Sequence, residues 1–354
     1  MAERVAAFLD GAHESLELAL YDVRLPGPAG DRVRAAIEGA AVRGVSVRLA
    51  YNEEREADDR VPGRISHGGE MRRIPIPPPP KTEVDLIESL TVPTRGIPGF
   101  RDLMHHKYVV RDGTDVWTGS MNWTQDAWTL QENVVATLAD ADVACYFRSN
   151  FEELWEERKV ETSGEQRPDP SDVSGTEVRA WFTPGNGRAL SHRIAEAIGG
   201  AQRRVRIASP VITAGPILGT LAQEVAEGSL DLAGVVDMPQ CAQVFHQWRN
   251  NGQSAWKIPL LAKVLGQGSF TGKPSTPYAP GAIHDYMHAK VTVCDDVAFV
   301  GSFNLSRSGE MNAENVLEIH STAHADAMAA FIDAVRGRYP AAAVPDDALS
   351  SPPR

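Results

Sequence analysis

The alternation of apolar and polar residues predicts the same order of strands and helices twice along the chain. In the first half, Leu16–Tyr21 and Val45–Tyr51 alternate as strands, and apolar residues at helical spacing over Asp31–Arg43 predict a helix between them. In the second half, Val205–Ala208 and Leu230–Val236 match the two strands. This strand–helix–strand order predicts a partly parallel sheet with helical cover.

Each half then continues with two apolar runs that are separated by a turn signal, which predicts a β-hairpin. The turn signals are Asp112-Gly113 and Asp295-Asp296. An amphipathic helix closes each half, over Asp142–Lys159 and over Ala325–Arg338. Corresponding features lie roughly half a chain length apart, so the pattern predicts a duplicated domain rather than a solenoid.

Two copies of one short motif stand at the start of these hairpins. Each copy fits H-x-K-x4-D, then G-S-x-N, and then a Glu-Asn pair. One such pattern would be weak support for a function because short motifs arise by chance, but two copies in the same order are strong support. The first copy contains His105, Lys107, Asp112, Ser120, Asn122 and Glu132-Asn133, and the second contains His288, Lys290, Asp295, Ser302, Asn304 and Glu314-Asn315.

The spacing of the motif places its polar groups together. Residues two apart in a strand share a face, so each histidine and its lysine point into the same space. The hairpin returns the serine and the asparagine to that end of the sheet. Two halves that face each other would therefore assemble two imidazoles, two ammonium groups, two hydroxyls and two amides. His106 falls on the opposite face, where packing or hydrogen bonding is expected.

Length and composition indicate a soluble globular protein of two domains. The chain has 354 residues, 42% hydrophobic and 23% charged. We predict an N-terminal half over 1–160, a linker over 161–175 and a C-terminal half over 176–354. A net charge of −12 argues against a protein that coats nucleic acid, although it leaves room for a local basic groove. Three cysteines make no disulfide framework.

The sequence also bears on location. The N-terminal residues lack the apolar core of a signal peptide, and no run of about 18 apolar residues predicts a membrane span. We therefore expect a cytoplasmic protein, or a secreted one if a leader has been removed.

The duplicated motifs resemble those of the phospholipase D superfamily, whose signature is H-x-K-x4-D followed by G-S-x-N. This resemblance implies an α/β fold of two similar halves, with mixed sheets flanked by helices and a pseudo-two-fold axis between them. It also implies one active site at the interface and a metal-independent phosphodiesterase that works through a phosphohistidine. His105–Trp155 and Gly301–Ile319 look similar to the small nuclease and cardiolipin-hydrolase branch, and the motif regions also resemble cardiolipin synthase-like proteins.

Members of that branch usually carry one motif per chain and dimerise. This chain carries two, so we expect a monomer with an internal pseudo-dimer. The second hairpin is one residue shorter than the first, which leaves open whether Asp295 or the adjacent Asp296 matches Asp112.

The expected chemistry assigns a role to each motif residue. A phosphodiester is an anion with a poor leaving group, so a site must neutralise charge, attack phosphorus and donate a proton. Lys107 and Lys290 would supply charge, Asn122 and Asn304 would donate hydrogen bonds, and Ser120 and Ser302 would support them. A histidine pKa near ~6.5 allows one neutral and one protonated ring near neutral pH.

Family precedent favours His105 as the nucleophile and His288 as the acid. It also suggests that Glu132 and Glu314 orient the two histidines, whereas Asp112 and Asp295 would be structural and close the hairpins. The remaining histidines show no metal-ligand spacing, so we expect neither a zinc site nor any other cofactor.

The substrate stays open at this point. A phospholipid substrate is favoured by the acidic balance and by apolar residues in the loops before each motif. The lipid would be either hydrolysed or transferred, with peripheral membrane contact as an option. A nucleic acid is the alternative, and a binding module on a decayed scaffold ranks last because both motifs are intact. Residues 52–100 are either a roof over the site or a surface excursion. The loop residues in question are apolar Ile97, Phe100, Phe270 and Tyr278, and basic Arg72, Arg73, Lys81, Arg95, Arg101, Lys263 and Lys273.

Overall fold

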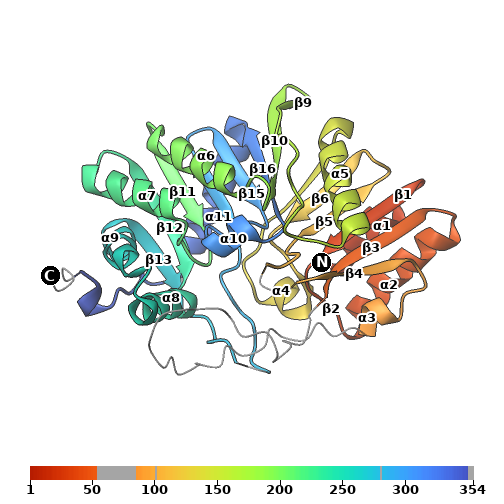
Figure 1. Cartoon of the computed structure of the whole chain (residues 1–354), viewed down its shortest axis with the longest axis horizontal. Coiled ribbons are helices and arrows are strands. Elements are labelled where there is room, and N and C mark those ends of the chain that lie inside the picture. Colours follow the sequence, from red (N-terminus) through yellow and green to blue (C-terminus); the bar gives the residue numbers. More distant parts are fainter. Residues whose placement is uncertain (54–84, 100–101, 280, 350–354) are drawn as a thin grey trace.

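Two β-sheets lie side by side in the computed structural model, which describes residues 1–53, 85–99, 102–279 and 281–349 (Figure 1). The N-terminal sheet has the strand order β4-β3-β1-β5-β6-β8. The first two neighbouring pairs in this order are parallel, and the other three pairs are antiparallel. The strands are β1 (Ser15–Leu20), β3 (Ser46–Glu53), β4 (Thr94–Pro98), β5 (Lys107–Arg111), β6 (Asp115–Gly119) and β8 (Val135–Ala139).

The C-terminal sheet repeats this order and adds two strands at one edge. Its order is β13-β12-β11-β14-β15-β16-β10-β9, and the first six strands have the same relative directions as the N-terminal six. The duplication predicted from the sequence is therefore confirmed. The strands are β9 (Ser171–Val173), β10 (Thr176–Thr183), β11 (Arg204–Ala208), β12 (Asp231–Asp237), β13 (Ser269–Lys273), β14 (Val291–Cys294), β15 (Val297–Gly301) and β16 (Glu314–His320).

Helices cover both faces of each sheet. On the outer faces lie α1 (Ala2–Asp10) and α2 (Gly27–Val42) in the first half, and α6 (Gly187–Gly199), α7 (Gly215–Glu227) and α9 (Ile258–Gln267) in the second. On the inner faces lie α5 (Ala141–Glu157) and α11 (Thr322–Arg336). The remaining elements are β2 (Val23–Arg24), α3 (Asp85–Glu88), β7 (Trp123–Thr124), α4 (Gln125–Thr129), α8 (Met238–Asn251), η1 (Ala255–Lys257), α10 (Arg307–Met311) and η2 (Asp346–Leu349).

One apolar core joins the two halves. Phe147 and Phe151 on the buried stripe of α5 belong to the same cluster as Phe182 of β10 and Val300 of β15. The Phe147 and Phe182 rings lie 5.0 Å apart, edge to face. Because apolar side chains from both halves exclude water together, burial stabilises the interface in the same way as it stabilises each half.

The predicted α/β fold with two similar halves is confirmed. Residues 171–173, inside the predicted linker, instead form β9 and pair with β10, while the half boundaries themselves stay a prediction. Residues 238–267 form α8, η1 and α9, which the sequence patterns did not predict. Most of the segment 52–100 lies outside the described residues, so its roof interpretation stays a prediction. No helix in the described ranges is long and apolar enough to span a bilayer.

Candidate active site

Each motif histidine is tied through its main chain to the opposite half. The amide of His105 donates to the carbonyl of Ala313 at 2.9 Å, and the amide of His288 donates to the carbonyl of Glu132 at 3.1 Å. Both bonds belong to short parallel bridges, Met104 with Ala313 and Met287 with Glu132. The bridges bring the segments before β5 and β14 to one interface, as the sequence motif predicted.

The two imidazoles have different partners. Nδ1 of His105 lies 2.7 Å from Oε2 of Glu314, a fully buried carboxylate. Nδ1 of His288 lies 3.1 Å from Oδ1 of Asn133, a neutral amide. Because a carboxylate and an amide oxygen both accept, Nδ1–H donates across the interface in both cases, and the lone pair of each neutral ring lies on Nε2. The site is therefore symmetric in its backbone and asymmetric in its electrostatics.

Glu132 does not orient His288, so the symmetric role predicted for the two glutamates is wrong for one of them. Its carboxylate instead binds Nζ of Lys273 at 2.7 Å and accepts a hydrogen bond from the hydroxyl of Tyr339. The physical reason is a shift of one residue. The backbone amide of Ser120 donates to the carbonyl of Val134, and that of Ser302 donates to the carbonyl of Asn315. The residues just before these carbonyls, Asn133 and Glu314, therefore occupy matching positions in the two halves.

The motif serines connect each turn to the residue that orients a histidine. Oγ of Ser120 donates to Oδ1 of Asn133 at 2.8 Å, and Ser302 bonds the Glu314 carboxylate. The hydroxyl of Ser120 also accepts a hydrogen bond from the backbone amide of Val134, and that of Ser302 accepts one from the amide of Asn315, both at 3.0 Å. The serines thus hold the orienting side chains in place.

The glycines before these serines are required by close backbone packing. A Cβ on Gly119 would lie 2.2 Å from the carbonyl oxygen of Val134, and one on Gly301 would lie 2.0 Å from that of Asn315. No side chain fits at such distances, which explains the glycine in both copies of G-S-x-N.

The two motif lysines are buried and bond back to their own histidines. Nζ of Lys107 donates to the carbonyl of His105 at 2.6 Å, and Nζ of Lys290 to that of His288 at 2.7 Å. Lys107 also lies 4.6 Å from the centre of the Tyr21 ring. Burial lowers the pKa of Lys107 to about 7. Burial, and then the positive charge of Lys107, lower the pKa of Lys290 well below its ordinary value.

Burial and the lysines also act on the other ionisable groups. They lower the pKa of His105 and that of His288 well below the ordinary value. Burial raises the pKa of Glu314 to about 7 despite the nearby lysines. A bound phosphodiester would bring negative charge beside the lysines and imidazoles, which favours their protonated forms. The lowered pKa values of the lysines and imidazoles therefore suit this site to an anionic substrate.

The asparagines of the two G-S-x-N turns complete the constellation. Asn122 is 9% exposed, and its Oδ1 has no hydrogen-bond partner in the described part of the chain. Its carbonyl accepts the indole N–H of Trp128 at 3.0 Å, which fixes the turn. Asn304 occupies the corresponding place after β15, partly exposed. A buried carbonyl oxygen without an internal donor would be satisfied by a hydrogen-bond donor, such as water or a hydroxyl group of a ligand.

A family model described as "Cardiolipin synthase, PLD-like domain" matches residues 5–155 and 194–335, which include both motifs and most of the chain. The chain belongs to the phospholipase D superfamily. Mitochondrial cardiolipin hydrolase of Xenopus laevis is 43% identical over 54 residues, and that of Xenopus tropicalis is 47% identical over 55. These matches cover 15% of this chain and 26% of each relative, so the chain matches about a quarter of their length.

Solved structures of low identity share the fold of this superfamily member. Phosphatidylserine synthase of Haemophilus influenzae Rd KW20 superposes with a TM-score of 0.61 at 11% identity, covering 95% of this chain and 83% of that protein. Polyphosphate kinase of Porphyromonas gingivalis superposes with a TM-score of 0.54 at 12% identity, covering 94% and 48%. Their different names underline that the fold alone does not set the substrate.

The motif aspartates of this superfamily member are structural, as predicted, but they act outside the hairpin. Asp112 accepts the backbone amides of His13, Glu14 and Ser15 at 2.7–3.0 Å. Asp295 accepts three amides in the same way, from the turn over 202–204. Burial raises the pKa of each carboxyl, but the three amide donors hold it below its ordinary value. Asp295, rather than Asp296, is thus the match of Asp112.

One further prediction can be placed, and one residue of the site was missed. His106 is fully buried on the far side of its strand, with Nδ1 3.3 Å from Oδ1 of Asn315, so it packs rather than faces the site. Sequence reasoning missed Asn133 as the partner of His288. Its place directly after Glu132 was visible, but only the backbone register shows which of the two residues reaches the ring.

Proposed function

We propose that this chain is a metal-independent phosphodiesterase of the phospholipase D type, which cleaves or transfers the head group of a phospholipid through a phosphohistidine. The observation that carries the proposal is the pair of imidazoles, each held at Nδ1 from the opposite half and flanked by a buried lysine. Membership of a superfamily of phosphodiesterases supports the reaction class.

The unequal partners favour His105 as the nucleophile. Its Nε2 lone pair attacks phosphorus, and the ring becomes positively charged as the P–N bond forms. The carboxylate of Glu314, 2.7 Å from Nδ1, stabilises that charge. As the bond from phosphorus to the leaving oxygen breaks, His288 gives that oxygen its proton.

The second step restores both rings. Neutral His288 takes a proton from water or an alcohol, whose oxygen attacks phosphorus and breaks the P–N bond. An amide partner stabilises the imidazolium of His288 less than a carboxylate would, so His288 releases its proton more readily. Lys107 and Lys290 would neutralise the phosphoryl oxygens, with Asn122 and Asn304 as hydrogen-bond donors.

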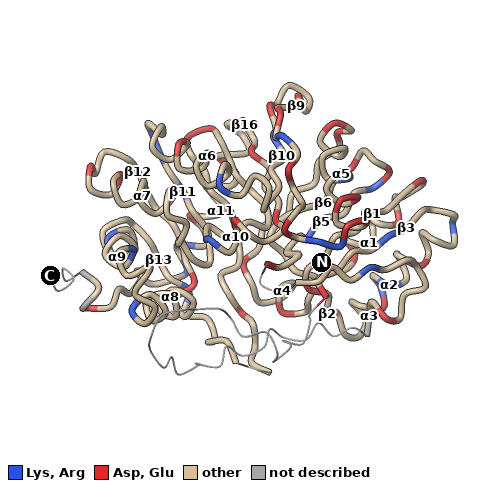
Figure 2. Tube along the Cα trace, in the orientation of Figure 1, with Lys and Arg blue, Asp and Glu red and all other residues tan. Residues whose placement is uncertain are grey.

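A phospholipid is the substrate class that the chain favours. The curated relatives are named cardiolipin hydrolases, and the matching family model is named for cardiolipin synthase. Figure 2 shows Asp and Glu interspersed with Lys and Arg along both halves, and the net charge is −12. A nucleic-acid substrate would instead be expected to select a dominant basic surface.

The test is turnover of lipid vesicles containing phosphatidylglycerol or cardiolipin, beside single-stranded DNA, all in EDTA. We expect lipid turnover that survives the chelator and disappears in His105→Ala and His288→Ala. Exposed His324→Ala is the matched control and should keep wild-type turnover. A 32P-labelled lipid should leave label on His105 when wild-type turnover is quenched in base. Cleavage of DNA alone, or loss of all activity in EDTA, would contradict the proposal.

A further inference from the structure

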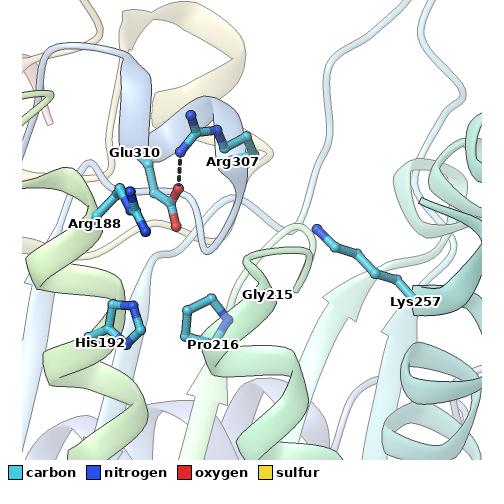
Figure 3. A pocket seen from close by; sticks show the side chains of 7 residues that line it. All are labelled: Arg188, His192, Gly215, Pro216, Lys257, Arg307 and Glu310. Atoms are coloured by element: carbon cyan, nitrogen blue, oxygen red, sulfur yellow. Dashed lines mark hydrogen bonds and ion pairs between the residues drawn. The ribbon is translucent and has the colours of Figure 1, made fainter. Parts of the chain in front are cut away.

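A cavity of about 140 Å³ lies outside the catalytic constellation, between α6, the start of α7, η1 and α10 (Figure 3). It remains close to that constellation in space. Arg307 follows Asn304 by three residues, so their Cα atoms are within about 11 Å of each other. The lining residues are Arg188, His192, Gly215, Pro216, Lys257, Arg307 and Glu310.

The lining of this cavity is cationic. Arg188, Lys257 and Arg307 face a single carboxylate, Glu310, which pairs with Arg307 at 2.7 Å. Arg188 and His192 stand one turn apart on α6 and so share a face. Neither has a hydrogen-bond or ion-pair partner within the described ranges, so both are available to a ligand.

Two more groups at the cavity favour an anion. Nζ of Lys257 donates one hydrogen bond, to the carbonyl of Thr213 at 2.9 Å, which leaves two of its protons for other acceptors. Helix α7 begins at Gly215 without a side-chain cap, and a Cβ added there would meet nothing within 4 Å. The positive end of the helix dipole therefore opens onto free space beside the cationic side chains.

A second cavity, of about 330 Å³, adjoins the first and shares Lys257 and Arg307 with it. Its wall is rich in neutral hydrogen-bonding groups. Gln240, Gln243 and Gln247 lie on one face of α8, at spacings of three and four residues, and Ser254, Ser306 and Ser308 add hydroxyls. Amides and hydroxyls both donate and accept, which suits a ligand that carries several hydroxyl groups.

We propose that the two cavities together form one subsite for a phosphorylated polyol. Its phosphate would bind between Arg188, His192 and Arg307 at the start of α7, and its hydroxyls would bind the glutamines of α8. The inference rests on the proposed function in one respect: it assigns this ligand as the head group of the lipid substrate. A substrate with a second phosphate on a polyol head group would then reach both the imidazoles and the subsite.

The subsite can be tested without turnover, by calorimetric titration of the whole chain at low salt. Glycerol 3-phosphate, inorganic phosphate and glycerol are the three probes. We expect glycerol 3-phosphate to bind at least about tenfold more tightly than either fragment. Arg188→Gln should weaken glycerol 3-phosphate and phosphate by about tenfold or more, because a charged hydrogen-bonding partner is lost. Gln243→Ala should weaken glycerol 3-phosphate while leaving phosphate unchanged.

The matched control is Arg4→Gln, which removes an exposed arginine from α1 in the other half and should change no affinity. Equal binding of glycerol 3-phosphate by wild type and Arg188→Gln would overturn the subsite. So would a Gln243→Ala variant with unchanged affinity for glycerol 3-phosphate. Oligonucleotide binding that is tighter than that of glycerol 3-phosphate and depends on Arg188 would overturn the head-group assignment.

Kinetics separate this inference from the proposed function. With vesicles of a lipid whose polyol head group carries a second phosphate, Arg188→Gln should raise KM about tenfold and leave kcat unchanged. With a lipid of a single phosphate, both constants should stay at wild-type values. Glycerol 3-phosphate binding without turnover of any lipid would contradict the proposed function and spare the subsite. Turnover of the lipid with the second phosphate at wild-type KM in Arg188→Gln would contradict the head-group assignment and spare the proposed function.

Discussion

Oε2 of Glu314 lies 2.7 Å from Nδ1 of His105, although the two residues belong to opposite halves of the chain. The corresponding contact in the other direction, from Asn133 to His288, uses an amide. The two rings therefore differ in how well a positive charge on each is stabilised, and this difference can be measured.

Replacing Glu314 with glutamine should lower kcat by about 10²-fold, because the nucleophilic ring loses the charge that stabilises its phosphorylated form. The amide of glutamine has nearly the same shape, so the protein should stay folded. Measurement of kcat for lipid turnover, with thermal unfolding as a check on folding, tests this. A fall in KM alone, at an unchanged kcat, would exclude a role in the chemical step.

Asn133→Asp gives His288 a carboxylate partner of the same size. We expect the pKa of His288 to rise, so that the ring stays protonated to higher pH and the optimum of kcat moves upward. The pH profile of kcat tests this. Asn133→Ala serves as the comparison, since it removes the acceptor without adding charge and should lower activity with no upward shift. An optimum that stays at the wild-type pH in Asn133→Asp would contradict the assignment of His288 as the acid.

Lys107 should set an alkaline limit on substrate capture. Its pKa of about 7 means that the side chain is charged below that pH and neutral above it. Since kcat/KM reports the free enzyme, kcat/KM should fall as the pH rises through about 7. Lys107→Arg keeps its charge at every accessible pH, and the fall should then be absent, whatever the absolute rate. An identical profile in this variant would assign the limit to another group.

Asp295→Ala should lower the free energy of unfolding by about 1–2 kcal/mol, because three backbone amides lose a charged acceptor. The neighbouring Asp296→Ala is the matched control and should have a much smaller effect, since Asp296 pairs with exposed Arg203. Because the folded pKa of Asp295 is depressed, its contribution is present above the ordinary value of 3.8 and lost as the pH falls through the folded pKa. Urea unfolding at neutral and acidic pH measures both effects.

Glu132→Gln separates interface stability from catalysis. Glu132 binds Lys273 and Tyr339 of the other half, and all three are at least partly buried. We expect a loss of about 1–3 kcal/mol in unfolding free energy with most of kcat retained. If kcat fell as far as it does in Glu314→Gln, Glu132 would act on His288 after all. Tyr339→Phe removes only one of the two partners of Glu132, so it should lower the unfolding free energy less than Glu132→Gln does.

The sequence predicted the parts of the molecule that repeat locally. Asp112-Gly113 and Asp295-Asp296 marked both hairpins, and Asp112, Gly113 and Asp295 indeed have positive φ angles. The apolar spacing of α5 was visible because its buried stripe follows one helical face over several turns. These signals depend on neighbours in the chain, which a sequence shows directly.

The predictions that were wrong concern the register between segments that are distant in the sequence. Two identical Glu-Asn pairs suggested equal roles, but the distance from the motif serine to the matching carbonyl is one residue longer in the first half. No local pattern records that shift, so Asn133 was overlooked and Glu132 was assigned to His288. Helices α8 and α9 were also missed, although polar and apolar residues of α8 line the larger cavity.

The covalent joining of two similar halves has a consequence for how the reactive centre could evolve. An assembly of two identical chains must place the same side chain beside both rings, because any substitution enters both copies at once. Here Asn133 and Glu314 occupy matching places and differ. Joining the halves in one chain thus permits a division of labour that symmetry would forbid, and the proposed mechanism uses it, with one ring to accept phosphorus and the other to pass protons.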